Sequence, residues 1–165
     1  MQIDSAPDLA GLLDRLVADE PAERGLKAWR SLLLAHATLM RQLETDLDRE
    51  TGLTLADFDV LAQLAVAGGA MRMTELATKG LISRSGMTRR VARLVDEGLV
   101  RRSNVDADAR GVVVALTDAG VARLTETWPI HARGISDLFV AQLDDHELAV
   151  LESAVDKVTL DCTFG

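Results

Sequence analysis

The sequence predicts a mainly helical fold with a small β component (α+β), in which long helices flank a segment of short helices and strands. Three observations predict it. Alanine and leucine, which favour helices, dominate outside residues 79–110. Apolar residues recur at spacings of three and four along residues 23–50 and 148–158, as on one face of a helix. Two short segments that contain valine, 99–102 and above all 112–116, have the composition of strands.

The composition indicates one domain with appended helices. The chain has 165 residues, of which 48% are hydrophobic, so it can build a core. Its single cysteine, Cys162, excludes an internal disulfide and a multi-cysteine zinc site, and a half-buried thiol is the simplest role for it. The amino terminus lacks the pattern of a signal peptide, and no apolar run is long enough to span a bilayer. We therefore expect a cytoplasmic protein without a cofactor.

The amino-terminal part is expected to hold an arm and a long helix. Residues 1–22 form the arm, with an amphipathic pattern that Pro21 closes. A helix over about 23–50 carries an apolar stripe and ends at Gly52, a residue that suits the carboxyl end of a helix. The stripe consists of Leu26, Trp29, Leu33, His36, Met40, Leu43 and Leu47.

Two short helices are predicted before Gly80. Thr54 and Asp57 have the spacing of a capping box, and they open a helix that runs to about residue 66. Thr74 is expected to cap the second, shorter helix.

A basic helix and a hairpin are predicted next. Ser83 can cap a helix over about 83–97, and Gly98 suits the left-handed position that follows a helix. The strand candidates 99–102 and 112–116 enclose a polar loop, so we expect a β-hairpin.

Two more helices complete the chain. Thr117 is expected to cap a helix over about 118–141, which Pro129 should bend. Asp144 and Glu147 have capping-box spacing and open the last helix. The apolar face of that helix consists of Leu148, Leu151, Val155 and Val158. Because the terminal helices are too apolar to stand alone, we expect them to pair with another subunit.

Residues 79–110 are basic although the chain is acidic. They hold eight lysines and arginines and four acidic residues, whereas the whole chain has a net charge of −8. A local excess of positive charge on an acidic protein indicates a polyanionic partner, of which double-stranded DNA is the obvious example.

The basic helix separates an apolar face from a polar one. At about 100° per residue, Met87, Val91 and Leu94 fall on one side, and Arg89 and Arg93 fall nearly opposite them. Small polar side chains let such a helix enter the major groove, and guanidinium groups can bond guanine or phosphate. The alternative is a solvated charged face on an ordinary helix.

The loop between the two strands carries Arg110, which could reach the narrow minor groove of DNA. An ion pair with Asp106 or Asp108 in the same loop is the alternative. Arg101 and Arg102 alternate faces on their strand, so at most one of them should point at DNA.

The order of these motifs resembles the multiple antibiotic resistance regulator (MarR) family over about residues 26–158. The motifs are Leu76-Ala77, Ser83-Arg84-Ser85-Gly86-Met87-Thr88-Arg89, Arg93-Leu94, Gly98-Leu99-Val100-Arg101-Arg102, Asp108-Ala109-Arg110 and Leu116-Thr117-Asp118-Ala119-Gly120. The resemblance implies a MarR-type domain over 23–165, with a winged helix-turn-helix over about 54–117. It also implies a homodimer, formed through dimerisation helices at about 23–50 and 118–160.

The resemblance further implies a wing at 99–116 and DNA contacts from the basic helix and the wing. The implied contacts are Ser83, Arg84, Ser85, Thr88, Arg89, Arg93 and Arg110. Asp108 would orient Arg110 or bridge to Arg93, so a structural role for Arg93 is equally open. Many members have an arginine where this chain has Ala109, so one phosphate contact is expected to be missing.

Members of the family often bind a small phenolic or anionic effector between the dimer helices and the winged domain. The candidate residues for such a ligand are Trp29, His36, Met40 and His131. A tryptophan would stack on an aromatic ring, and a histidine would bond its carboxylate. The alternative is that Trp29 and His36 pack in the dimer core. The histidines are too scattered to predict a metal site.

The leading hypothesis is a sequence-specific DNA-binding regulator, a homodimeric repressor that a small effector releases from a pseudo-palindromic operator. The second hypothesis is a winged-helix adaptor that binds proteins without specific DNA binding, and the basic face argues against it. No phosphate loop, nucleophile elbow or motif-placed pair of carboxylates indicates an enzyme.

Overall fold

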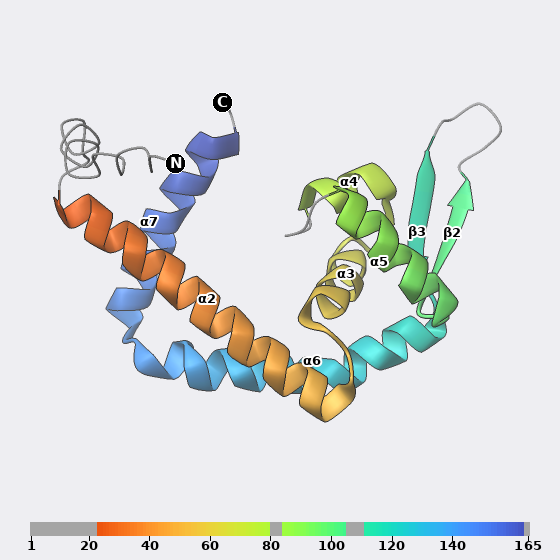
Figure 1. Ribbon diagram of the computed structural model, residues 1–165, viewed down its shortest axis with the longest axis horizontal. Coiled ribbons are helices and arrows are strands. Elements are labelled where there is room, and N and C mark those ends of the chain that lie inside the picture. Colours follow the sequence, from red (N-terminus) through yellow and green to blue (C-terminus); the bar gives the residue numbers. More distant parts are fainter. Residues whose placement is uncertain (1–22, 80–83, 105–110, 164–165) are drawn as a thin grey trace, which may run out of the picture. The chain divides into compact units, whose positions relative to one another are not determined.

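The computed structural model describes residues 23–79, 84–104 and 111–163. These residues form a mainly helical fold with one small antiparallel sheet, which confirms the predicted fold class (Figure 1). The contacts divide the chain into two units, residues 1–38 and residues 39–165. The amino-terminal arm lies outside the described residues. So do Gly80, the predicted cap Ser83 and the loop of the wing with Asp106, Asp108 and Arg110.

Helix α2 (Glu23–Thr51) ends where the sequence predicts, because Gly52 follows it with a φ of 69°, a left-handed conformation that glycine adopts without strain. Thr54 is the amino-terminal cap of α3 (Leu55–Val66). Its hydroxyl accepts a hydrogen bond of 3.2 Å from the backbone N–H of Asp57. The predicted boundary between these two helices is therefore confirmed.

Helix α4 (Met73–Lys79) begins one residue before Thr74, so Thr74 lies inside the helix and the prediction that it caps α4 is wrong. Helix α5 (Arg84–Asp96) covers the predicted basic helix, and Gly98 follows it with a φ of 71°. The left-handed glycine turns the chain from α5 into the next strand.

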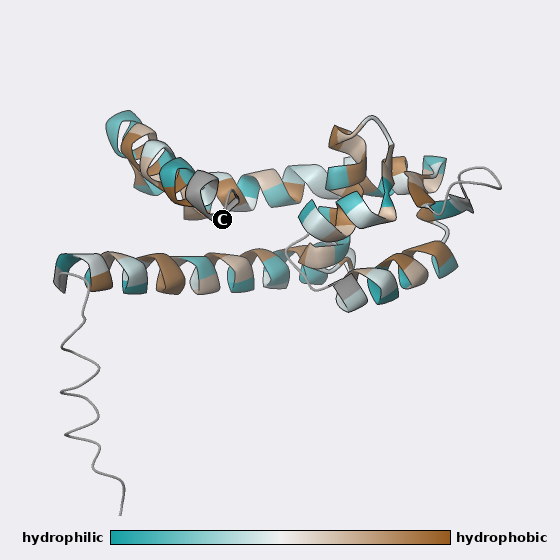
Figure 2. Ribbon diagram, turned by 90° about the horizontal axis from the view of Figure 1, so that it is seen from above, coloured by the Kyte–Doolittle hydropathy of each residue, from teal (hydrophilic) through white to brown (hydrophobic). Residues whose placement is uncertain are grey.

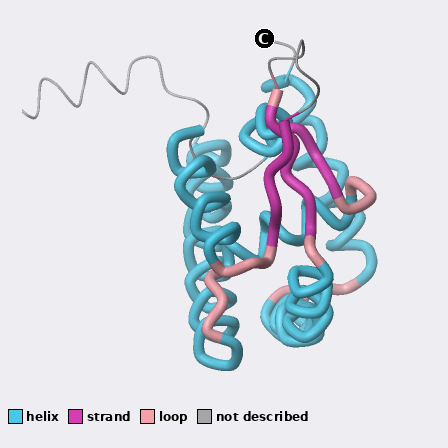
Figure 3. Tube along the Cα trace, turned by 90° about the vertical axis from the view of Figure 1, so that its right-hand side faces the viewer, coloured by secondary structure: helices cyan, strands magenta, loops and turns pink. Residues whose placement is uncertain are grey.

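The sheet has three antiparallel strands in the order β1–β3–β2 (Figure 3). Strands β2 (Val100–Asn104) and β3 (Val112–Leu116) form the predicted hairpin. Strand β1 (Ala70–Arg72) was not predicted, because its three residues, Ala-Met-Arg, have no strand signature of their own. It exists through pairing with β3, in which Arg72 lies opposite Val113.

Helix α6 (Asp118–Leu138) begins at the predicted cap and runs through Pro129, and Figure 1 shows that it curves along its length. It ends earlier than predicted, because the short 3₁₀ helix η1 (Val140–Gln142) follows it. Helix α7 (Asp145–Thr163) opens with the predicted capping box. The backbone N–H of Glu147 donates to Asp144 at 2.8 Å, and that of Asp144 donates to Glu147 at 3.0 Å.

The hydrophobic core lies where α3, α4 and α5 pack with the sheet. Its fully buried side chains include Val60, Leu61, Leu64, Leu76, Met87, Val91, Leu94 and Val114. Hydrophobic residues also continue along α2 and α7 (Figure 2), and many of these are exposed in the single chain. No helix in the described residues is long and apolar enough to cross a membrane.

Candidate nucleic-acid interface

The apolar side of α5 is seated in the core as predicted. Met87, Val91 and Leu94 have no exposed surface, whereas Arg89 on the other side of the helix is exposed. Burying three large side chains fixes the rotation of the helix about its axis. The core therefore determines which face of the helix is exposed.

A buried carboxylate on α3 holds two arginines of α5. Asp57 is only 1% exposed, and its Oδ1 lies 2.7 Å from Nη1 of Arg90. The same nitrogen of Arg90 donates to the hydroxyl of Thr54 at 2.9 Å, and Arg93 forms a second ion pair with the Asp57 carboxylate. We call Asp57, Arg90 and Arg93 the carboxylate clamp. It ties the basic helix to the first turn of α3.

The clamp divides the arginines of α5 by role. Arg93 is half-exposed and also lies 3.5 Å from Glu97, so two carboxylates surround its guanidinium. Sequence reasoning left a structural role open for Arg93 but named Asp108 as the partner, and it placed Asp57 only in a capping box. Arg89 has no hydrogen bond or ion pair from its guanidinium within the described part of the chain.

The remaining predicted contacts of α5 lie near its amino-terminal end. Arg84 is the first residue of the helix, and Ser85 and Thr88 occupy exposed positions in its first turns. Because the side chains of Ser85 and Thr88 are short, the helix has a small diameter on the side that carries Arg89. A helix face of short polar side chains can insert into the major groove of DNA.

The wing strand β2 is joined to α5 by Arg102. Its Nη2 donates to the backbone carbonyl of Thr88 at 3.1 Å. Arg101 lies opposite Ala115 and Arg102 opposite Val114, so the two arginines alternate faces as predicted. Arg102 therefore braces the hairpin against the helix.

The predicted ligand residue His131 lies in an aromatic cluster between α3 and α6. Its ring centroid is 4.4 Å from that of Phe58, and Trp128 stacks on Phe58 at 6.1 Å. Burial lowers the pKa of His131, and the Asp59 carboxylate partly offsets that effect. Burial likewise raises the pKa of Asp59, against a hydrogen bond of 2.6 Å from the Gln63 amide.

The other predicted ligand residues are distributed between the two units. Trp29 and His36 are exposed on the part of α2 that belongs to residues 1–38, whereas Met40 is half-buried and belongs to residues 39–165 with His131. Sequence reasoning missed Phe58 and Asp59 as neighbours of His131. The apolar pattern of α3 marks Phe58 only as a core residue.

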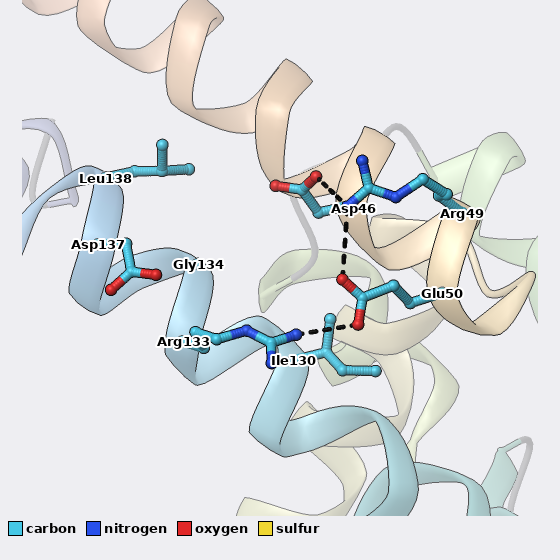
Figure 4. A pocket seen from close by; sticks show the side chains of 8 residues that line it. All are labelled: Asp46, Arg49, Glu50, Ile130, Arg133, Gly134, Asp137 and Leu138. Atoms are coloured by element: carbon cyan, nitrogen blue, oxygen red, sulfur yellow. Dashed lines mark hydrogen bonds and ion pairs between the residues drawn. The ribbon is translucent and has the colours of Figure 1, made fainter.

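A polar cavity of about 400 Å³ lies between the carboxyl-terminal half of α2 and α6 (Figure 4). Four of its charged residues form ion pairs: Arg133 with Glu50 at 2.9 Å, and Arg49 with Asp46 at 3.0 Å. Its lining consists of Asp46, Arg49, Glu50, Ile130, Arg133, Gly134, Asp137 and Leu138. None of the four predicted ligand residues lines it.

Comparison with known proteins identifies the arrangement. Residues 51–111 match the MarR family. The MarR family transcriptional regulator Sco3205 from Streptomyces coelicolor, solved in complex with DNA, is 32% identical. The match covers 86% of this chain and 91% of Sco3205, with a TM-score of 0.78. The chain belongs to the MarR family.

Two further transcriptional regulators are similar to this chain over most of their length. AbsC, a MarR family regulator from Streptomyces coelicolor, has a TM-score of 0.80 and 29% identity, over 88% of this chain and 99% of AbsC. An HTH-type transcriptional regulator of Bacillus cereus is 29% identical over 126 residues, which are 76% of this chain and 83% of the relative. This MarR family member is therefore a transcriptional regulator with a winged helix-turn-helix.

Proposed function

We propose that this MarR family regulator is a homodimeric, sequence-specific DNA-binding repressor that acts in the cytoplasm. The observation that carries the proposal is the division of arginines on α5. The clamp pairs Arg90 and Arg93 with Asp57, and Arg89 remains exposed on a helix whose rotation the core fixes. Arg89 pairs with no carboxylate among the described side chains, and a firmly held helix that presents such a guanidinium is suited to reading a guanine edge.

The proposed DNA contacts follow from this division. Arg89 reads a base, whereas Ser85, Thr88 and the residues that begin the helix contact the backbone or neighbouring bases. Arg110 enters the minor groove from the wing. The proposed contacts are Ser83, Arg84, Ser85, Thr88, Arg89 and Arg110, with Arg93 as a positioning residue whose exposed half faces phosphate.

The proposed homodimer uses the flanking helices, with the MarR-type domain over 23–165 and the arm over 1–22. The support is apolar surface that the single chain leaves exposed. On α2 and α7 these exposed side chains are Trp29, Leu32, Leu33, Leu34, Val150, Leu151, Val155 and Val158. Burying such surface in a second copy would place two basic helices roughly 10 bp apart on a pseudo-palindrome.

The proposed effector is a small aromatic or anionic molecule that binds next to His131. The aromatic cluster supports this, because Trp128 is 54% exposed and can stack on a ring while His131 bonds a carboxylate. Met40, which belongs to the same unit of residues 39–165, remains a candidate for this site, and Trp29 and His36 remain candidates for ligand binding on their own part of α2. Because α3 carries both the cluster and the clamp, a ligand there would shift the population of DNA-competent dimers.

The experiment that tests the proposal is a fluorescence anisotropy titration of the purified protein with the duplex upstream of its own gene. A scrambled duplex of the same composition is the control, and both are titrated over a salt series. We expect tight binding to the upstream duplex only, with a steep salt dependence. Equal binding to both duplexes, with none selected from a random-sequence pool, would contradict sequence-specific regulation.

A further inference from the structure

Arg72 lies at the root of the wing, although it belongs to none of the segments proposed to contact DNA. In the sheet it pairs with Val113 of β3, at the end of β1 that lies nearest the wing loop. Gly111 is the first described residue after that loop. A Cβ added to Gly111 would lie 3.6 Å from Nη1 of Arg72, so the guanidinium rests against the backbone where the loop ends.

The face on which Arg72 projects follows from the register of the strands. Met71 and its partner Val114 are buried on the core side of the sheet. Neighbouring residues on a strand point to opposite faces, so Arg72 projects to the outer face and its side chain is exposed. Arg101 shares that outer face from β2 but lies opposite Ala115, two residues farther from the wing loop along β3.

Arg72 is also an uncommitted cation. Within the described part of the chain its guanidinium has no hydrogen bond and no ion pair, and the same holds for Arg101. By contrast, Arg90 and Arg93 bind Asp57, and Arg102 binds the Thr88 carbonyl. An exposed guanidinium that neutralises no carboxylate keeps its full charge for an external anion.

A loop that enters a minor groove brings its own root to the sugar-phosphate backbone, because the groove is narrow and phosphates line both edges. We propose that Arg72 binds a DNA phosphate at the edge of the groove that the wing enters. This inference rests on the proposed function and adds a contact from β1. It assigns Arg72 to positioning the wing on any sequence, since phosphate contacts carry no base information.

The test compares Arg72→Gln with the matched control Arg101→Gln. Both variants remove one unpaired arginine from the outer face of the same sheet, so long-range electrostatic effects are alike. The probe is a duplex that the wild-type protein enriches from a random-sequence pool, and anisotropy gives Kd between 50 and 200 mM NaCl. Equal melting temperatures of the three proteins establish that both variants fold.

We expect Arg72→Gln to bind more weakly and to lower the slope of log Kd against log salt by about 0.9. Its deficit relative to wild type should therefore shrink roughly threefold between 50 and 200 mM salt. Discrimination between the enriched and a scrambled duplex should not change. Arg101→Gln should keep nearly the wild-type slope.

The inference is overturned if Arg72→Gln keeps the wild-type slope of log Kd against log salt. It is also overturned if Arg101→Gln lowers that slope as much as Arg72→Gln does. Either result leaves the proposed function standing, because the wild-type protein still selects its duplex. If the wild-type protein enriches no sequence and binds all duplexes alike, the proposed function itself fails and the contact fails with it. The wild-type titration thus separates the two failures.

Discussion

At the scale of single residues, the carboxylate clamp explains how an acidic protein presents a basic helix. Asp57 is buried on α3, and it can be charged there only because Arg90 and Arg93 surround it and the Thr54 hydroxyl donates to it at 2.5 Å. Two arginines that the sequence places on a basic helix, Arg90 and Arg93, are therefore paired with a carboxylate inside the protein. Arg89 remains as the exposed arginine of this helix that pairs with no carboxylate among the described residues.

Replacing Asp57 with asparagine should loosen α5 and destabilise the fold. Removing the carboxylate leaves the partly buried Arg90 without a counter-charge and Arg93 with only the exposed Glu97, and breaking a buried pair in this way costs up to about 3 kcal/mol. Thermal unfolding and DNA binding should both weaken. The control is Glu97→Gln, which removes an exposed partner of Arg93 and should change stability by less than about 1 kcal/mol. Wild-type melting of Asp57→Asn would show that the clamp does not hold the helix.

A second residue-scale prediction concerns pH. Burial lowers the pKa of His131 below its ordinary value of 6.5, so the unfolded chain binds the proton more readily than the folded one. The free energy of unfolding should therefore fall as the pH drops below about 6.5. The raised pKa of Asp59 acts in the opposite direction, in the range above that group's ordinary value of 3.8.

His131→Gln should reduce this loss of stability on acidification. The measurement is chemical denaturation at pH 7.5 and 5.5, with His146→Gln as the control because His146 is exposed on α7. A His131→Gln protein that loses as much stability as wild type between these pH values would contradict the assignment of the effect to burial of His131.

At the scale of elements, the junction of the wing with α6 depends on Thr117 and Gly120. The Thr117 hydroxyl accepts the Gly120 N–H at 3.0 Å, which caps α6, and donates to the Gly98 carbonyl at 2.6 Å. Gly120 packs so closely on the segment between α5 and β2 that an added Cβ would lie 2.0 Å from the Leu99 carbonyl oxygen. Thr117 thus joins the end of α5, the hairpin and α6. Its bond to the Gly120 N–H explains the spacing of threonine and glycine in the motif.

Gly120→Ala should therefore destabilise the protein by about 2 kcal/mol or more, because the Leu99 carbonyl cannot move away from the added methyl group without a shift of the backbone. The matched control is Gly134→Ala in the same helix, where the Cβ would meet only the end of the Leu43 side chain, at 2.7 Å. That side chain can rotate, and alanine favours the helix, so the control should lose much less. A Gly120→Ala protein that melts at or above the control would refute the close-packing argument.

How much of this was readable from the sequence depends on the distance over which each feature is encoded. Caps, left-handed glycines and the apolar face of α5 are local patterns, and they predicted most helix boundaries and the seat of the basic helix. The clamp is not local, because Asp57 and Arg90 are 33 residues apart on different helices. Strand β1 is likewise created by its pairing with β3. Neither the clamp nor strand β1 can be predicted from a single segment of the sequence, because each depends on a contact with a distant residue.

At the scale of the whole molecule, the fold combines a winged helix-turn-helix with long helices that expose apolar side chains. The rigid core and the clamp set the direction in which α5 projects, whereas the proposed dimer sets the spacing of two such helices. We propose that Arg89 recognises the DNA sequence. Phosphate contacts from the wing and from Arg72 at its root contribute to the affinity for any sequence. A proposed effector near His131 would act through α3 and not by contact with Arg89.

Whether α5 reads DNA through Arg89 is tested by the ratio of Kd values for a selected and a scrambled duplex, compared between wild type and Arg89→Ala. We expect Arg89→Ala to weaken binding to the selected duplex by about 1–3 kcal/mol and binding to the scrambled duplex much less. Sedimentation should show the same oligomeric state for both proteins. An unchanged ratio with an intact fold would contradict the assignment of α5 as the element that reads DNA.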